Sequence, residues 1–195
     1  MTALAEHLQP IDWKTIDDGL YDWLVDLLDV SVIWENQNVP QPPYPYLSLL
    51  RNSVVMLGGT PEKRYSTDLG QPAGQEIEIE ATSMVEFTLS INAHVDMDAG
   101  ANDPSCNAVA LLGKARASLG KLSVQRNFQD NLGLAIVQEL GVTDLSVVVN
   151  DEWISRAIFD VRLRTRSVMT ERTGYTDKVR IKSTQLGVDV LVDAS

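Results

Sequence analysis

The sequence predicts an α+β fold in which helices pack on a mainly antiparallel or mixed β-sheet. Residues 77–95 and 157–168 alternate apolar with polar side chains, whereas residues 15–29 and 103–122 carry apolar side chains at helical spacing. Alternation this long indicates strands with one buried and one polar face, and this favours antiparallel neighbours.

The length and composition are those of an ordinary globular protein. A chain of 195 residues with 44% hydrophobic and 22% charged residues suits one domain, expected over residues 1–195 with residues 1–14 as a flexible N-terminal arm. We expect no secretory signal and no membrane span, because no basic region precedes an apolar one and no apolar run is long enough. Cys106 is the single cysteine, which excludes an intrachain disulfide and fits synthesis in a reducing cytoplasm.

The formal net charge is −11 at pH 7. Phosphate contacts need clustered Lys and Arg, so this charge argues against tight binding of nucleic acid. It is compatible with DNA that passes nearby without binding.

The first predicted helix covers residues 15–29. Thr15 is a suitable N-cap, and Asp17 and Asp18 suit the positive end of the helix dipole. The apolar stripe consists of Ile16, Leu20, Trp23, Leu24 and Leu27.

Residues 32–46 form the most unusual stretch. An apolar triplet ending in Trp34 predicts the start of a strand, and the four prolines in residues 40–45 predict a stiff extended or turned connector. The Tyr44–Pro45 bond is a candidate for a cis peptide. Two interpretations stay open: a rigid connector without chemistry, or a docking loop for another chain.

The strands that follow are predicted at residues 47–57 and 77–95. Between them, residues 60–75 are polar and rich in glycine and proline, so residues 58–80 are expected to form an extended loop or hairpin. Asp103 and Pro104 predict the start of the second helix, a short helix follows at residues 123–131, and further strands are expected within residues 134–149, 157–168 and 178–192.

Charge is unevenly distributed along the chain. Residues 1–30 and 61–103 are acidic, while residues 156–182 are basic. Segments of opposite charge allow copies of a chain to associate head to tail, which is how rings close.

Candidate catalytic and metal-binding residues are few. His94 lies on the polar face of a predicted strand, and without a G-x-S-x-G motif we expect a solvated or interface histidine. Asp96, Asp98 and Asp103 suggest an oxygen-ligand metal loop, but Asn107 stands where an EF-hand needs an acid, and a polar turn with a helix cap is the alternative. We expect no cofactor.

Two rows of like charge complete the candidates. Glu76, Glu78 and Glu80 are either paired carboxylates for acid–base chemistry or, more simply, a solvated edge that discourages aggregation. The other row consists of Arg162, Arg164 and Arg166. These arginines could bind phosphate or pair with acids of a neighbouring subunit, and we favour the second alternative because the protein is acidic.

Two blocks resemble a known family. Residues 20–24 (LYDWL) and 32–38 (VIWENQN), followed by Pro40, Pro42 and Pro45-Tyr46, resemble the opening of tailed-bacteriophage neck or tail-terminator proteins. Residues 152–163, in which Arg156 leads into the alternating strand, resemble a closing strand of that family. The acidic segment at residues 60–80 has no counterpart that we can place.

The resemblance implies a compact, non-catalytic α+β virion protein. Such proteins form a ring, most simply six-fold, at the head-proximal end of the tail, stop tube growth, and join the tail to the head connector or collar while DNA passes. The implied partners are other copies, the tail tube, the connector, the sheath where present, and DNA without sequence-specific binding. Hypothetical interface residues are Trp34, Asn36, Asn38, Pro45, Tyr46, Glu76, Glu78, Glu80, Arg156, Arg162, Arg164 and Arg166.

Two alternatives stay open. One is another virion position, as a head-completion or baseplate protein. The other is a small acidic metal-dependent enzyme that uses the glutamates of residues 76–80 or the acids of residues 96–103.

Overall fold

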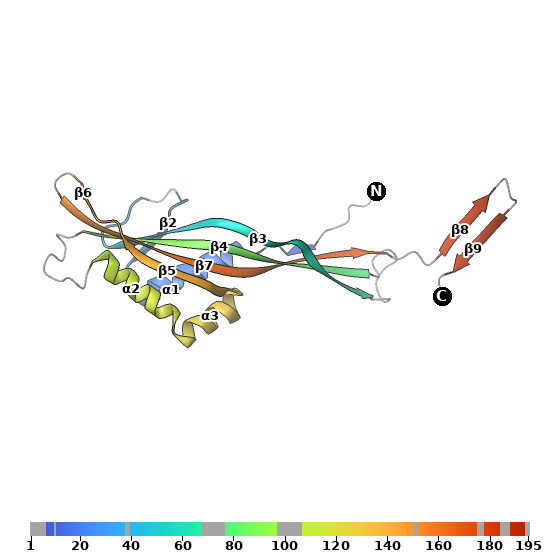
Figure 1. Cartoon of the computed structure of the whole chain (residues 1–195), viewed down its shortest axis with the longest axis horizontal. Helices are drawn as coiled ribbons and strands as arrows, with labels where there is room; N and C mark the ends of the chain where they lie inside the picture. Colours follow the sequence, from blue (N-terminus) through green and yellow to red (C-terminus); the bar gives the residue numbers. More distant parts are fainter. Residues whose placement is uncertain are drawn as a thin grey trace. The chain divides into compact units, whose positions relative to one another are not determined.

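The computed structural model describes residues 7–9, 11–37, 40–67, 77–96, 107–149, 152–174, 178–183 and 188–193. It confirms the α+β prediction: within these residues a seven-stranded, mixed and mostly antiparallel sheet is accompanied by three helices (Figure 1). The chain divides into two compact units, one of Met1–Pro10, Thr60–Thr82 and Val168–Ser195, and the other of Ile11–Gly59 and Ser83–Ser167. We call them the small and the large unit.

The elements follow one another in a simple order. They are β1 (His7–Gln9), α1 (Trp13–Leu28), β2 (Ser31–Trp34), β3 (Tyr46–Thr67), β4 (Ile77–Asp96), α2 (Ala108–Leu119), α3 (Leu122–Leu132), β5 (Ala135–Asp144), β6 (Val147–Val149), β7 (Glu152–Thr173), β8 (Lys178–Ser183) and β9 (Val188–Asp193). The strand order in the main sheet is β1-β7-β4-β3-β2, and β5 and β6 also pair with β7.

Strand pairing in the large unit is antiparallel except at one edge. Strand β2 runs parallel to β3, with Val32 opposite Leu47, whereas β5 and β6 run antiparallel to β7. Side-chain contacts join Ser48 to His94 and Asn52 to Ser90. Moving four residues forward along β3 therefore moves four residues back along β4, which is antiparallel pairing.

The core of the large unit lies between one face of the sheet and the three helices (Figure 1). Alternate residues of β3, β4 and β7 supply the sheet side, and each fully buried Leu or Phe contributes about 1.5–3 kcal/mol. The most deeply buried members are Leu47, Leu49, Phe87, Leu89, Ile91, Phe159 and Leu163 from strands, and Leu20, Leu24, Leu112, Leu119 and Phe128 from helices.

Trp23 connects the three helices. Its ring meets Phe128 of α3 edge-on at 5.2 Å between centroids, and its indole Nε1 donates to Ser118 Oγ of α2 at 3.1 Å. Ser118 Oγ donates in turn to the carbonyl of Ala115 at 2.7 Å, so every polar atom of this buried contact is satisfied. Helices α1 and α3 also approach closely at Gly19, where an added Cβ would lie 2.3 Å from Leu132 Cδ2 and the Leu132 side chain would have to move.

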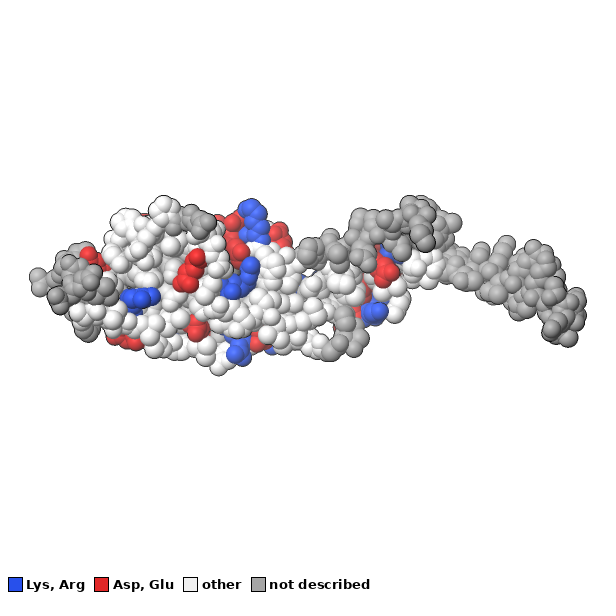
Figure 2. Space-filling model, turned by 90° about the horizontal axis from the view of Figure 1, so that it is seen from above, with Lys and Arg blue, Asp and Glu red and all other residues white. Residues whose placement is uncertain are grey.

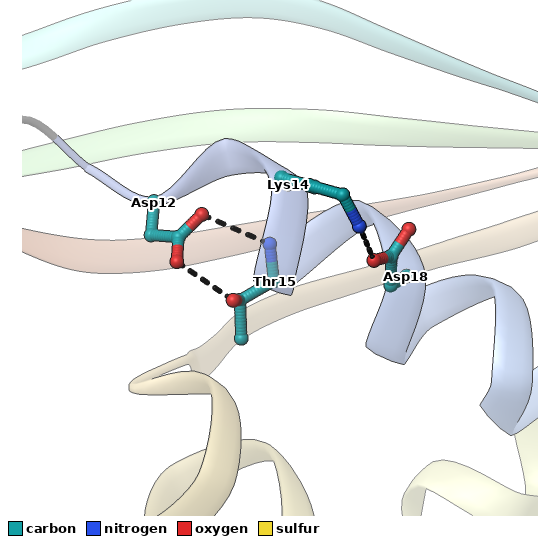
Figure 3. Close-up of polar contacts among 4 residues, drawn as sticks. All are labelled: Asp12, Lys14, Thr15 and Asp18. Carbon is teal, nitrogen blue, oxygen red and sulfur yellow. Dashed lines mark hydrogen bonds and ion pairs between the residues drawn. The ribbon is translucent and has the colours of Figure 1, made fainter.

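Helix α1 begins earlier than predicted. The N-cap is Asp12, which accepts hydrogen bonds from Thr15 N at 3.1 Å and Thr15 Oγ1 at 2.7 Å, and Lys14 pairs with Asp18 one turn along (Figure 3). The predicted cap Thr15 is therefore wrong: it is the third helical residue and the donor to the real cap. The hydrogen bonds from Thr15 lower the pKa of Asp12.

Other boundaries also differ from the prediction. Strand β3 continues to Thr67, into the segment at residues 58–80 that was predicted as an extended loop or hairpin, and β7 is longer than residues 157–168. Helix α2 begins at Ala108 with Asn107 as its N-cap, while Asp103 and Pro104 lie outside the described residues. Within the expected N-terminal arm, His7–Gln9 forms β1.

The small unit is stabilised by strand pairing. Strand β1 runs antiparallel to β7, with Leu8 opposite Met169. Strands β8 and β9 form a separate antiparallel pair, as predicted for residues 178–192, with Ile181 opposite Val190. No helix among the described residues is long and apolar enough to cross a membrane.

Replacing Ser118 with Ala should destabilise the protein, because the indole N–H of Trp23 loses its buried acceptor. We expect the free energy of unfolding to fall by about 1–3 kcal/mol, measured by denaturant titration. The exposed Ser123→Ala is the matched control and should change little. Equal losses in Ser118→Ala with and without Trp23→Phe would contradict the coupling of these two side chains.

Candidate functional site

A hydrogen-bonded group of side chains lies on the sheet face opposite the helices. Glu35 Oε1 accepts from Ser48 Oγ and from Asn92 Nδ2, both at 2.8 Å. His94 Nε2 lies 3.3 Å from Ser48 Oγ, and its ring stacks on Tyr46 at 4.5 Å with an interplanar angle of 8°. We call these five residues the Glu35 cluster. Ser48 alternates with the fully buried Leu47 and Leu49, which places the cluster on the other face.

The directions of the hydrogen bonds are not those of a catalytic triad. The Ser48 hydroxyl has one proton, which it donates to Glu35, so the contact with His94 requires the imidazole Nε2–H to donate to Ser48. In a triad the acid binds the imidazole and the imidazole accepts the serine proton. The Glu35 cluster therefore holds strands and a loop together.

The sequence predicts a solvated or interface histidine at position 94, and of these two alternatives the structure argues against the solvated one. Its side chain is partly buried between Tyr46 and Ser48. Burial lowers the pKa of His94 below its ordinary value, the Arg156 guanidinium lowers it further, and Glu35 acts in the opposite direction. The lowered pKa favours the neutral imidazole, whose Nε2–H tautomer is the one that can donate to Ser48.

The proline-rich connector is anchored to this cluster by aromatic rings. The Tyr44–Pro45 bond is cis, as predicted, and the Tyr44 and Tyr46 rings lie 5.5 Å apart. Tyr46 is buried, and this burial raises its pKa. Of the predicted interface residues here, Tyr46 thus positions the loop, while Pro45 is exposed and accessible to a partner.

Trp34 and Asn36 line a cavity of about 660 Å³ between α1 and the turn after β2. Its wall includes an ion pair in which Arg51 Nη1 donates to Asp17 Oδ1 at 2.6 Å, with the guanidinium 4.0 Å above the Trp13 ring. Burial raises the pKa of Asp17, while Arg51 acts in the opposite direction. Asn38, predicted for the same surface, lies outside the described residues.

The basic row on β7 is paired largely within the chain. Glu86 of β4 forms salt bridges with Arg162 at 3.4 Å and with Arg164 at 3.0 Å, and the Glu86 side chain is only 15% exposed. Arg166 and Arg156 are exposed, and the described part of the chain offers neither a salt bridge.

The acidic row belongs to the small unit. Glu78 pairs with Arg172 at 2.8 Å, and Glu80 accepts from Thr82 at 3.4 Å. Glu76 lies outside the described residues, as do Asp98, Asp103 and Cys106. Within the described ranges, no group of three or more His, Cys, Asp or Glu side chains is arranged to hold a metal ion.

Most contacts of this site could not be predicted from the sequence, because they join residues that are far apart in the chain. Arg51 and Asp17 are 34 positions apart, and Glu35 and Asn92 are 57 apart. Ser48, a polar residue within an apolar run, was the one sequence signal for this site. Its partners could not be predicted, because they depend on the register of β3 against β4.

The fold and the site define a protein whose described polar side chains mostly hold its own strands and loops in place, as in an assembly protein. A family model described as phage neck terminator protein matches residues 14–192, and the chain belongs to this family. No curated protein matches the sequence. The predicted family is thereby confirmed, and the protein is a structural component of the phage neck.

Replacing His94 with Gln should remove one source of acid sensitivity. Because the folded-state pKa of His94 is lowered, the unfolded chain binds a proton first, and stability is lost as pH falls from the ordinary value of 6.5 through the folded pKa. Denaturant titrations between pH 8 and pH 5 should show a shallower decline for His94→Gln. An identical decline in both proteins would contradict this role.

Replacing Glu86 with Gln should leave Arg162 and Arg164 without a counter-charge. We expect the free energy of unfolding to fall by about 1–2 kcal/mol, a value between those of exposed and buried ion pairs. Thermal or denaturant unfolding measures this change. The control is Glu62→Gln, whose pair with Arg64 is exposed and should contribute little. Equal effects of the two substitutions would contradict the structural role of Glu86.

Proposed function

We propose that this chain forms a ring, six-fold in order, at the head-proximal end of the phage tail. The ring ends growth of the tail tube and joins the tail to the head connector or collar while DNA passes through. The observation that carries this proposal is the match of residues 14–192 to the neck terminator family.

The partners that this role requires are other copies, the tail tube protein, the connector and, in a contractile tail, the sheath. The surface that supports such contacts includes the exposed Asn36, in the turn after β2, and the exposed Pro45, on the connector that Tyr46 anchors. Arg156 and Arg166 add exposed positive charge that the described residues leave without a salt bridge, which suits acids of a neighbour.

The charge of the protein supports passage of DNA. A net charge of −11 repels phosphate, so DNA can slide past without being held. Figure 2 shows acidic and basic side chains interspersed with uncharged surface, and no broad basic track appears on the described part of that face.

Deleting the gene from the phage tests the proposal. We expect tails of uncontrolled length and heads that carry no tail, because nothing caps the tube or offers the connector a surface. Electron microscopy of the lysate, with tail lengths measured, gives the readout, and a plasmid copy of the wild-type gene should restore normal particles. Normal-length, head-joined tails in the deletion would overturn the proposal.

A further inference from the structure

The outer edge of β3 carries an unusual apolar strip at residues 54–57. Four consecutive side chains, Val54, Val55, Met56 and Leu57, are between 36% and 60% exposed. Strand β2 covers this edge only as far as Leu49, and no other described strand pairs there. Exposed apolar edge strands invite pairing with another chain, and soluble proteins normally protect them.

The opposite edge of the same sheet is also open and apolar. Strand β6 pairs with β7 on one side, and no described strand pairs with its other side. Val147 and Val148 on β6 are 41% and 52% exposed, and Val137 on the neighbouring β5 is exposed as well. Strand β5 has two register shifts that disturb its edge, which makes β6 the better template.

The helices beside these two edges carry opposite charge. Helix α1 contacts β2 and is joined to β3 by Arg51 and Asp17, whereas α2 and α3 contact β5. Residues 12–29 contain six acidic side chains and one basic, and residues 108–132 contain four basic and one acidic. Arg116 of α2 already pairs with Glu139 of β5 at 3.5 Å. Each edge of the sheet therefore combines an apolar strand with a helix surface of predominantly one sign.

The acidic surface of α1 is formed at the expense of the helix itself. Asp18, Asp22 and Asp26 are exposed and spaced by four residues, so they lie on one face. Asp18 pairs with Lys14, whereas Asp22 and Asp26 repel one another. Asp26 and Asp29 also lie at the C-terminal end, where the helix dipole disfavours negative charge and the last turn has no basic residue. An arrangement that weakens the helix is explained by a cationic partner.

We infer that residues 54–57 of one copy are covered by the β5–β6 edge of the next copy, with α1 facing α2 and α3 across the contact. The inference rests on the proposed ring and names its interface. Head-to-tail contact brings acid against base, whereas a symmetric contact of two β3 edges would bring the acids of two α1 helices together. The occupant of the strip is therefore a second copy in a heterologous arrangement, the type that closes a ring.

Cross-linking between two different variants tests this pairing. In a Cys106→Ser background, Val55→Cys and Val148→Cys are prepared separately, mixed at high concentration and treated with a short bismaleimide. We expect covalent dimers in the mixture and few dimers from either variant alone. The chain that carries both cysteines should give a series of cross-linked oligomers that ends at the number of subunits in the ring. Met84→Cys on β4, where Met84 is 46% exposed against 53% for Val55, replaces Val55→Cys in the control and should not cross-link.

Charge exchange tests the same contact without cysteine. Asp22→Lys with Asp26→Lys, or Lys121→Glu with Arg126→Glu, should each weaken association about tenfold or more, and mixing the two double variants should recover part of the loss. Asp130→Lys changes the charge by +2 on the basic side, half the change made by either double variant, and should not weaken association.

The outcomes separate this inference from the proposed function. Dimers of Val55→Cys with itself, or rings seen by native mass spectrometry without the mixed cross-link, would overturn the edge assignment and leave the ring standing. A lack of any cross-link in the mixture would also overturn it. Normal tails in the gene deletion would overturn the neck role, whatever the cross-links show.

Discussion

Strand β4 provides the constraint on which the large unit depends, because its two faces have different tasks. Residues at odd positions from Val85 to Val95 are buried against the helices, and those between them carry the ion pair of Glu86 and the contacts of Asn92 and His94. A shift of register by one residue would move apolar side chains to the polar face and polar ones into the core. The fold and the Glu35 cluster are therefore fixed together.

The polar contacts of this face serve mainly to hold elements in place. Glu35 joins the turn after β2 to both β3 and β4, the stacked rings of Tyr46 and His94 anchor the proline-rich connector, and Glu86 joins β4 to β7. The hydrogen bond of Ser48 to Glu35 and that of Arg164 to Glu86 are partly buried and match a donor with an acceptor, which makes them specific as well as stabilising. The exposed remainder, including Pro45 and Arg156, is what a partner can reach.

The sequence predicted those features that depend on local pattern. Alternation along β4 and β7 and the apolar stripes of α1 and α2 indicated the α+β class, and the Tyr44–Pro45 dipeptide was a candidate for the cis bond that the structure has. The cap of α1 was misassigned because Asp12 and Thr15 are both good caps, and Trp13 packs edge-on against Phe87, which suits an earlier start. Arg162 and Arg164 were assigned to a neighbour because the register that places Glu86 beside them is not encoded in either strand alone.

The two edges of the sheet are the surfaces through which the fold can assemble with other copies. A chain whose sheet ends in two apolar strands, flanked by helices of opposite charge, has the complementary surfaces that repeated head-to-tail contact requires. A cryo-electron microscopy reconstruction of the neck in purified phage tests this account most directly. It predicts a closed ring of this chain at the top of the tail tube, with residues 54–57 covered by the adjacent copy. A neck in which this chain is absent, or present as isolated copies with that strip exposed, would contradict it.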